Sequence, residues 1–260
     1  MNKALGAPSA LVAQCRHITL PVQPAVHLAK LSNPRRFALP NFPTRRFPKK
    51  ASQTATLSGA VKRLSLGVLA LQGDFEAHAR VLRSLETDVR LVRAPSDLEG
   101  LDGLVIPGGE STVMSRLGER YGLIEPLRAK IQGDFPVFGT CAGLIFLAQR
   151  LEGASQTFAQ STLGVLDCTI ARNAYGAQNE SFQSEVDIPL LNGFVPATFI
   201  RAPRIVEVGD AVEVLGEWNG EAVVVRQNAI MACAFHPEIE GETRLHRLWI
   251  EDIQSRESAQ

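Results

Sequence analysis

The stretch FPVFGTCAGLIFLAQRL at residues 135–151 places one cysteine between two apolar segments of different character. Its beginning is a short apolar run typical of a buried strand, and its end carries Leu144, Leu147, Ala148 and Leu151 at helical spacing. Between them, Gly139-Thr140-Cys141-Ala142-Gly143 has the Gly-x-nucleophile-x-Gly pattern of a nucleophile elbow, with sulfur in place of oxygen. The stretch therefore predicts a strand, a sharp turn at Cys141 and a helix.

The predicted turn at Cys141 has two interpretations. A strand that turns directly into a helix holds its corner residue in a strained conformation, so the residues two before and two after need to be nearly free of side chain. Such a corner would point the thiol into solvent, beside free helix N–H groups that lower a thiol pKa and stabilise an oxyanion. The alternative is a structural cysteine buried near a glycine turn, and the rest of the chain has to decide between them.

Charge is distributed unevenly along the 260 residues, although the formal net charge is zero. Residues 1–63 contain eleven lysines and arginines and no acid, which leaves 16 basic and 27 acidic residues in 64–260. An acidic body argues against nucleic-acid binding by the folded part. No apolar run is long enough to span a bilayer, so we expect no membrane-spanning segment.

The basic segment 1–63 is rich in proline and has no consistent hydrophobic periodicity, so we expect a disordered N-terminal extension. Its lack of acids is also typical of an organelle transit peptide. An upstream translation start that the folded protein does not need, or an appendage that docks on an acidic surface, are further alternatives. The sequence leaves these interpretations open.

From Leu64 onward, apolar strand patterns alternate with helical patterns across short loops. The expected strands are 64–71, 88–93, 102–109 and the strand before Cys141, and the expected helices include 75–85, 111–120 and 123–132. This alternation predicts an α/β fold with a parallel sheet covered by helices on both faces. Ligands bind such sheets beyond the carboxyl ends of the strands, where PGGEST (107–112) and the Cys141 turn both lie.

Beyond residue 163 the pattern changes to closely spaced strands, with Asn219-Gly220 as a hairpin turn and an amphipathic helix over 242–253. The four cysteines are Cys15, Cys141, Cys168 and Cys233, and they form no C-x-x-C pair and no metal-ligand spacing. We therefore expect no metal site and no disulfide framework. Cys168 and Cys233 lie inside apolar strand patterns and are predicted to be core residues. A cysteine nucleophile needs a free thiol, which favours a reducing compartment and a cytoplasmic location.

His236 is the candidate partner for the thiol among the five histidines. It ends the apolar run 230–235 and precedes Pro237, which favours an extended backbone. In an extended segment residues i and i+2 project to the same side, so Glu238 can orient the His236 ring. By contrast, His78 and His246 lie in helical patterns, for which we predict a surface or packing role. A strand-end turn with unrelated polar residues is the structural alternative for His236.

Several longer motifs resemble the class I, or triad, glutamine amidotransferases. The matching stretches run in one order over about residues 65–253: GVLALQGDFEAH (67–78), LVIPGGEST (104–112), GTCAGLIFLA (139–148), GVLDCTIARNAYGAQ (164–178), FIRAP (199–203) and FHPEIEGETRLHRLW (235–249). More narrowly, LALQGDFEAH, PGGEST and RNAYGAQ resemble the glutaminase subunits of pyridoxal 5′-phosphate synthases. The resemblance implies a flavodoxin-like three-layer sandwich with a mostly parallel central sheet, formed by one domain over residues 64–255.

The resemblance also implies roles for individual residues. Cys141 would be the nucleophile, His236 the general base and Glu238 its orienter, and the backbone N–H groups of Gly109 and Ala142 would form the oxyanion hole. The positions that match the glutamine-binding residues of the family are Gly109, Glu110, Ser111, Arg172, Ile200 and Arg201. A glutamine pocket needs an acid for the ammonium and a guanidinium for the carboxylate, and these residues supply both. The alternative for Arg172 and Arg201 is ordinary solvated charge.

The activity implied by the resemblance is hydrolysis of L-glutamine to glutamate and ammonia through a thioester on Cys141, with no cofactor. The implied partner is a pyridoxal 5′-phosphate synthase subunit that accepts the ammonia in a hetero-oligomeric complex. The glutaminase subunit of another complex, such as imidazole glycerol phosphate synthase, and a non-catalytic flavodoxin-like binding module remain alternatives. Two features depart from the family pattern: the long N-terminal segment, and Ala177 at a position that is often basic.

Overall fold

The computed structural model describes residues 63–152, 160–172 and 181–258, all of which belong to one compact unit, Ser58–Gln260. The interpretations of the N-terminal extension lie outside the described residues, except for Arg63. The loop that contains Ala177 also lies outside them.

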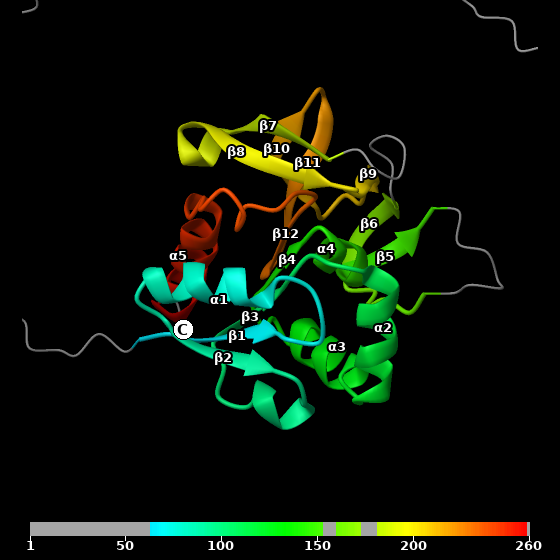
Figure 1. The fold of residues 1–260 in the computed structure, drawn as a ribbon, viewed down its shortest axis with the longest axis vertical. Helices are drawn as coiled ribbons and strands as arrows, with labels where there is room; N and C mark the ends of the chain where they lie inside the picture. Colours follow the sequence, from blue (N-terminus) through cyan, green and yellow to red (C-terminus); the bar gives the residue numbers. More distant parts are fainter. Residues whose placement is uncertain (1–62, 153–159, 173–180, 259–260) are drawn as a thin grey trace, which may run out of the picture. The chain divides into compact units, whose positions relative to one another are not determined.

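The chain alternates strands and helices up to α4 and then continues mainly in strands (Figure 1). The strands are β1 (Ser65–Leu69), β2 (Asp88–Val92), β3 (Gly103–Ile106), β4 (Val137–Thr140), β5 (Ala148–Leu151), β6 (Leu166–Ala171), β7 (Ser181–Ile188), β8 (Gly193–Ile200), β9 (Arg204–Val208), β10 (Glu213–Trp218), β11 (Glu221–Gln227) and β12 (Ile230–Cys233). The helices are α1 (Phe75–Ser84), α2 (Ser111–Arg120), α3 (Ile124–Gln132), α4 (Ala142–Leu147) and α5 (Arg244–Ser258), with 3₁₀ turns η1 (Pro95–Leu98) and η3 (Pro189–Leu191).

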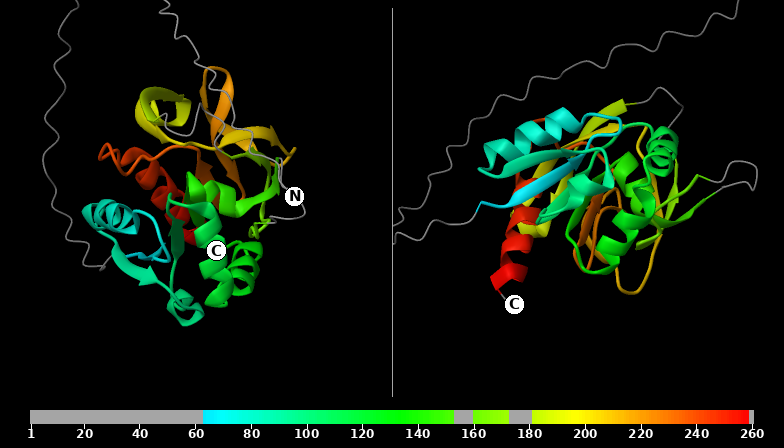
Figure 2. Two further views of the ribbon diagram at one scale, coloured as in Figure 1. Left: turned by 45° about the vertical axis from the view of Figure 1, so that its right-hand side comes forward. Right: turned by 90° about the horizontal axis from the view of Figure 1, so that it is seen from below.

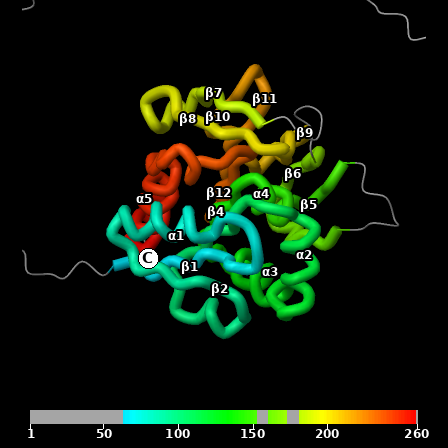
Figure 3. The backbone as a smooth tube through the Cα atoms, viewed as in Figure 1, coloured from blue at the N-terminus to red at the C-terminus, as the bar shows by residue number. Residues whose placement is uncertain are grey.

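The main sheet has the strand order β2-β1-β3-β4-β12-β11-β10-β7-β8. Its first five strands are parallel, and their order follows the doubly wound pattern of flavodoxin-like folds. The chain reaches the fifth position late, because β12 enters beside β4 only after the antiparallel strands are complete (Figure 3). The predicted α/β fold class is confirmed.

Helices cover both faces of the parallel strands (Figure 2). On one face, α1 and α5 meet through His78 and His246, and the indole ring of Trp249 lies directly over Gly103 of β3. A Cβ atom at Gly103 would lie 2.9 Å from that ring, so the close approach of α5 to the sheet requires glycine. On the other face, α2 packs against α4, with α3 beside them.

The antiparallel strands β11, β10, β7 and β8 extend the sheet beyond β12. The predicted hairpin turn is present between β10 and β11, where Asn219 and Gly220 both have positive φ. The rings of Phe182, Phe199 and Trp218 pack against one another on this extension, with centroids 4.7 to 5.4 Å apart. A separate three-stranded sheet, β5-β6-β9, lies beside the main one.

The helix after Cys141 is shorter than predicted. The spacing of apolar residues predicted a helix to Leu151, but α4 ends at Leu147 and residues 148–151 form β5. Ala148 has extended backbone angles, and β5 then pairs with β6. A short buried strand and a buried helix show the same apolar composition, so the spacing alone could not separate them.

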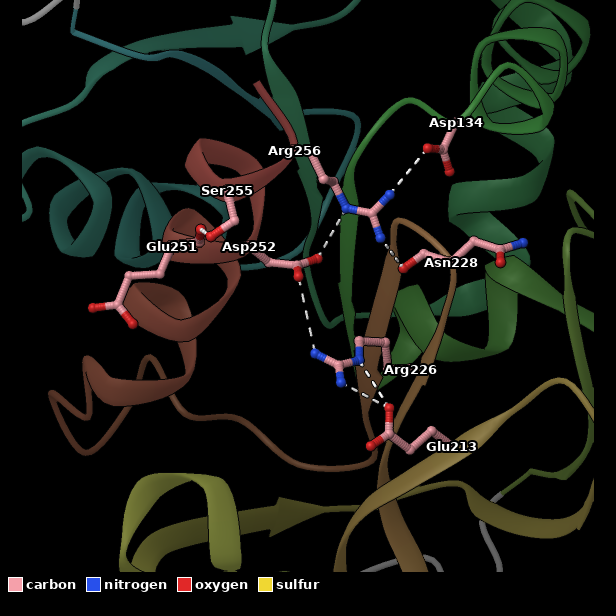
Figure 4. Close-up of polar contacts among 8 residues, drawn as sticks. All are labelled: Asp134, Glu213, Arg226, Asn228, Glu251, Asp252, Ser255 and Arg256. Atoms are coloured by element: carbon pink, nitrogen blue, oxygen red, sulfur yellow. Dashed lines mark hydrogen bonds and ion pairs between the residues drawn. The ribbon is translucent and has the colours of Figure 1, made fainter. Parts of the chain in front are cut away.

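Two arginines connect the C-terminal helix to the sheet (Figure 4). We call the cluster the arginine network, and its members are Asp134, Glu213, Arg226, Asp252 and Arg256. Arg256 contacts the carboxylates of Asp134 at 3.0 Å and Asp252 at 3.2 Å, and donates to the Asn228 carbonyl oxygen at 2.6 Å. Arg226 bridges Glu213 at 2.7 Å and Asp252 at 3.9 Å. These side chains connect α5 with β10, β11 and the segment before β4.

Over the part of the chain that the structure describes, no helix has both the length and the apolar character needed to cross a membrane.

Candidate active site

Cys141 occupies the corner between β4 and α4 with φ 49° and ψ −103°, a conformation that costs a side-chain-bearing residue on the order of 1–3 kcal/mol. The flanking glycines make this corner possible. A Cβ atom at Gly139 would lie 2.9 Å from the carbonyl carbon of Gly143, and one at Gly143 would lie 2.1 Å from the carbonyl oxygen of Ile106. The predicted nucleophile elbow is thus confirmed in its geometry.

We expected the thiol to point into bulk solvent, and this expectation is wrong. Cys141 is only 5% exposed, and its sulfur lies in a cavity of about 160 Å³, 3.9 Å from the carbonyl oxygen of Ile200. The correction has a physical reason: strand β8 and the segment around His236 close over the corner, so the cysteine faces a cavity instead of open water.

His236 is held opposite the cysteine by backbone contacts. Its N–H donates to the Thr198 carbonyl oxygen at 2.9 Å, in a bridge between the segment after β12 and β8. Its ring packs onto Gly108, where a Cβ atom would lie 2.2 Å from Cε1. His236 Nδ1 lies 2.7 Å from Glu238 Oε1, as the extended backbone at Pro237 predicted. The ring can therefore occupy only a narrow range of orientations.

The pKa values of His236 and Glu238 are both shifted strongly from their ordinary values. Burial lowers the pKa of His236, but hydrogen bonds to Cys141 and Glu238 and their charges outweigh it and raise that pKa to about 10. Burial raises the pKa of Glu238, yet His78 and His236 together bring it down to about 2. An imidazolium beside a sulfur is the usual partner of a reactive thiolate. The arrangement suits nucleophilic catalysis with His236 as proton carrier.

Eight of the ten predicted site residues line the cavity: Gly109, Glu110, Ser111, Cys141, Arg172, Ile200, Arg201 and His236. Glu238 lies behind His236, and Ala142 follows the cysteine as the first residue of α4. Ile145 also lines the cavity, which the sequence did not predict. Arg201 has φ 44°, a left-handed conformation that ends β8 and turns the chain at the cavity.

The predicted acid and one predicted arginine already have protein partners. Glu110 caps α2, since its carboxylate accepts from the N–H groups of Thr112 at 3.1 Å and Val113 at 2.8 Å. Burial raises the pKa of Glu110, but the backbone donors and Arg172 lower it by more, so the net shift is downward. Glu110 is therefore a carboxylate at neutral pH. Arg172 donates to the side-chain oxygen of Gln160. An ammonium group would therefore meet negative charge at this end of the cavity.

Sequence reasoning missed Gln160. Its side-chain oxygen accepts from both Ser111, at 3.2 Å, and Arg172, at 2.5 Å. It thus ties together two predicted site residues that come from α2 and from the end of β6. No motif contains Gln160, and nothing in the sequence indicated that it would approach this cavity.

Gly109, a predicted oxyanion donor, has φ 141°, which L side chains rarely adopt. A Cβ atom there would also lie 2.4 Å from Gln72 Oε1, the atom that accepts from the Glu110 N–H at 2.9 Å. The glycine-rich loop after β3 is thereby held against the loop after β1. Both loops follow carboxyl ends of strands, as expected for a site in this fold.

Of the two predicted roles for His78 and His246, packing is confirmed and a surface position is wrong, because both side chains are fully buried. Both are also connected to the candidate site. His78 Nε2 lies 3.4 Å from Glu238 Oε2 and 3.1 Å from Thr140 Oγ1, and its Nδ1 lies 2.9 Å from His246 Nε2. A signal was present in the sequence, because Leu82 follows His78 by one helical turn and places it on the apolar face of α1. The long-range pairing of α1 with α5 was not visible.

Within residues 63–152, 160–172 and 181–258, no group of three or more His, Cys, Asp or Glu side chains is arranged to hold a metal ion. Cys168 and Cys233 are fully buried core residues, as predicted. Burial raises the pKa of Cys168 to about 12 and also that of Cys233, with Asp167 and Glu238 respectively adding to the effect. Neither thiol is suited to form a thiolate at neutral pH.

Comparison with known proteins gives concordant results. The profile of the SNO glutamine amidotransferase family matches residues 68–255. A protein named pyridoxal 5′-phosphate synthase subunit PdxT from Nocardioides sp. is 48% identical over 192 residues, covering 72% of this chain and 94% of the relative. A PdxT from Geobacillus kaustophilus is 45% identical over 197 residues, with coverage of 75% and 98%. A crystal structure described as a glutamine amidotransferase aligns with a TM-score of 0.69 at 41% identity, covering 73% of this chain and 98% of the other.

Proposed function

The chain belongs to the SNO glutamine amidotransferase family, and we propose on that premise that it is the glutaminase subunit of a pyridoxal 5′-phosphate synthase. The observation that carries the proposal is the Cys141–His236–Glu238 arrangement at the strand ends, inside a cavity with an acid and two arginines. The reaction is hydrolysis of L-glutamine to L-glutamate and ammonia.

In the first half of the reaction, the Cys141 thiolate attacks the side-chain amide carbon of glutamine. The negative charge moves to the amide oxygen, for which the N–H groups of Gly109 and Ala142 are the proposed donors. His236 then gives its proton to the amide nitrogen, the C–N bond breaks and ammonia leaves. The product on the enzyme is a γ-glutamyl thioester, and His236 is left neutral.

In the second half, water attacks the thioester and His236 takes one of its protons. The tetrahedral intermediate collapses, the C–S bond breaks, and the thiolate and the imidazolium are restored. The new γ-carboxyl group releases the second proton of the water to solvent, and glutamate leaves. One water is consumed for each glutamine, and Glu238 keeps its negative charge throughout. Its role is to orient the ring and to stabilise the imidazolium.

The cavity residues fit the two charged groups of free glutamine. We assign the substrate ammonium to Glu110, and the carboxylate to Arg201 and Arg172. Ser111 and Ile200 complete the glutamine-binding set. Arg201→Ala should raise the KM for glutamine about tenfold to a hundredfold with a much smaller change in kcat, because the ion pair forms in the ground state and the transition state alike. Loss of kcat at constant KM would instead place Arg201 in the chemical steps.

The ammonia needs a partner that receives it directly, because ammonia released into neutral water is protonated and is no longer a nucleophile. We propose that this partner is the synthase subunit of the same complex, and that a reducing compartment such as the cytoplasm keeps Cys141 active. The test is a glutaminase assay of the purified chain with and without that subunit. We expect weak hydrolysis alone and faster hydrolysis with the partner. A chain with no activity in either condition would contradict the proposal.

A further inference from the structure

Glu238 is a buried carboxylate whose two oxygens differ in their hydrogen bonding. Oε1 accepts from His236 Nδ1 at 2.7 Å, but Oε2 is buried and makes no hydrogen bond of normal geometry. A buried carboxylate oxygen without a donor is costly, since it has lost its water. His78 Nε2 lies 3.4 Å from Oε2.

His78 belongs to a chain of side chains that the catalytic steps above do not use. Its Nδ1 lies 2.9 Å from His246 Nε2, which joins α1 to α5. Its Nε2 also lies 3.1 Å from Thr140 Oγ1, and Thr140 directly precedes the nucleophile. Both histidines are fully buried, and burial lowers the pKa of each, that of His246 to about 3, which disfavours the charged form of both rings, although the Glu238 carboxylate acts in the opposite direction on each. In its neutral form each ring carries a single N–H.

The charge on Glu238 determines where these two protons lie. With its proton on Nε2, His78 donates toward Glu238 Oε2, and its bare Nδ1 accepts from His246 Nε2–H. His246 Nδ1 is then a bare ring nitrogen, in agreement with its lack of a hydrogen-bond partner. The reverse arrangement turns His246 Nδ1–H toward the Glu242 backbone and sets the lone pair of His78 Nε2 against a carboxylate. That arrangement is repulsive, so the first one is favoured.

We propose that His78 and His246 form a positioning relay behind the catalytic residues. His246 donates to His78, and His78 donates to Glu238 Oε2. Each carboxylate oxygen thereby faces an imidazole N–H, and Oε1 stays directed at His236 Nδ1. The same Nε2–H lies 3.1 Å from Thr140 Oγ1, so this N–H is shared between the carboxylate and the Thr140 hydroxyl, which joins the imidazole to the strand that carries Cys141. The inference rests on the proposed glutaminase function only for its kinetic consequence; the proton positions can be measured without it.

Three substitutions of His78 separate this role from simple packing. His78→Gln places an amide N–H near the original Nε2, His78→Asn places one near the original Nδ1, and His78→Phe fills the space without a donor. We expect kcat to fall on the order of tenfold to a hundredfold in the Asn and Phe variants, and clearly less in the Gln variant. KM for glutamine should not change, because His78 does not line the cavity. Equal losses in Gln and Asn, or a loss confined to KM, would contradict the relay.

A measurement on the resting protein tests the relay without catalysis. In the full chain with ¹⁵N-labelled histidine, NMR should show His78 protonated at Nε2 and His246 protonated at Nε2. The His236 Nδ1–H signal should shift in His78→Asn and be restored toward the wild-type position in His78→Gln. Protonation of His78 at Nδ1 would overturn the proposal even if the enzyme is active. A wild-type chain without glutaminase activity would overturn the proposed function, and the NMR result would still decide the relay.

Discussion

Strands β4 and β12 lie side by side and carry a charged cluster at each end. Their carboxyl ends, where Thr140 pairs with Cys233, lead into the buried triad. Their amino ends, where Val137 pairs with Ile230, adjoin the arginine network (Figure 4). The strands are four residues long, so the two clusters share one short piece of scaffold.

The two clusters differ in burial and in the number of partners per charge. Glu238 is 5% exposed and His236 8%, and each depends on one or two neighbours. The Arg256 side chain is 31% exposed and has two carboxylates and a carbonyl oxygen as partners. A group with several interchangeable partners is hardly changed by losing one. We therefore infer that reactivity resides at the carboxyl ends of β4 and β12, where each charged group has few partners, and that the arginine network at the amino ends contributes modest stability.

The largest expected effect is at the nucleophile. Cys141→Ala should lower kcat by at least about 10⁴-fold, because no other group in the cavity can form the thioester. The free energy of unfolding should change by no more than about 1 kcal/mol, since a smaller side chain fits the same elbow. Activity assays and chemical denaturation measure the two effects.

A glutamine analogue with an electrophilic side chain provides the control for this prediction. It should label the wild-type chain at Cys141 and leave Cys168 and Cys233 unmodified, because both are core residues with raised pKa values. Label on either core cysteine, or wild-type turnover by Cys141→Ala, would refute the assignment of the nucleophile.

The next largest effects distinguish the role of His236 from that of Glu238. His236→Asn should cost nearly as much activity as Cys141→Ala, because the thiol loses its base and the leaving ammonia loses its proton donor. Glu238→Ala should cost less by roughly ten- to a hundredfold, since it only orients and stabilises the imidazole. The double variant Cys141→Ala/His236→Asn should be no slower than either single variant. Additive losses would mean that the residues act independently.

How much of this could be predicted from the sequence depends on the range of each interaction. The elbow and the His236–Glu238 pair are local, because glycines at fixed offsets and Pro237 determine the backbone nearby. Gln160 and the contact between His78 and His246 depend on tertiary packing, and the last two are 168 residues apart. The end of α4 at Leu147 depends on pairing with β6, which the apolar spacing did not reveal.

The arginine network was invisible for the same reason. Arg256 and Asp134 are separated by 122 residues, and neither belongs to a recognisable motif. Sequence could place charged residues in a helix and in a loop, but it could not pair them. Local chemistry was thus predictable at the catalytic end of the strands, and the assembly of the opposite end was not.

The dependence of stability on pH should also distinguish the two ends. The pKa of His236 is raised to about 10 from its ordinary value of 6.5, so its contribution is complete below pH 6.5 and is lost as the pH rises through 10. Between these values the wild type should lose on the order of a few kcal/mol relative to His236→Asn. Denaturant titrations in a reducing buffer measure this difference. Arg256→Ala keeps His236 and should therefore follow the wild-type curve. A curve for His236→Asn that runs parallel to that of the wild type would contradict the assignment.

The smallest expected effect is at Arg256 itself. Arg256→Ala removes contacts with Asp134, Asp252 and the Asn228 carbonyl oxygen, yet all of these remain accessible to water or to Arg226. Exposed ion pairs contribute between zero and about 1 kcal/mol, so we expect a loss of about 1 kcal/mol that shrinks at high salt. Arg256→Lys is the matched control, because it keeps the charge but loses the several N–H donors of the guanidinium. Its free energy of unfolding should lie between those of the wild type and Arg256→Ala. Because the four-residue strands lie between the network and the triad, kcat and KM should stay at the wild-type values. A fall in kcat in Arg256→Ala would show that the two ends of β4 and β12 are coupled, and that the division between reactive end and stabilising end is wrong.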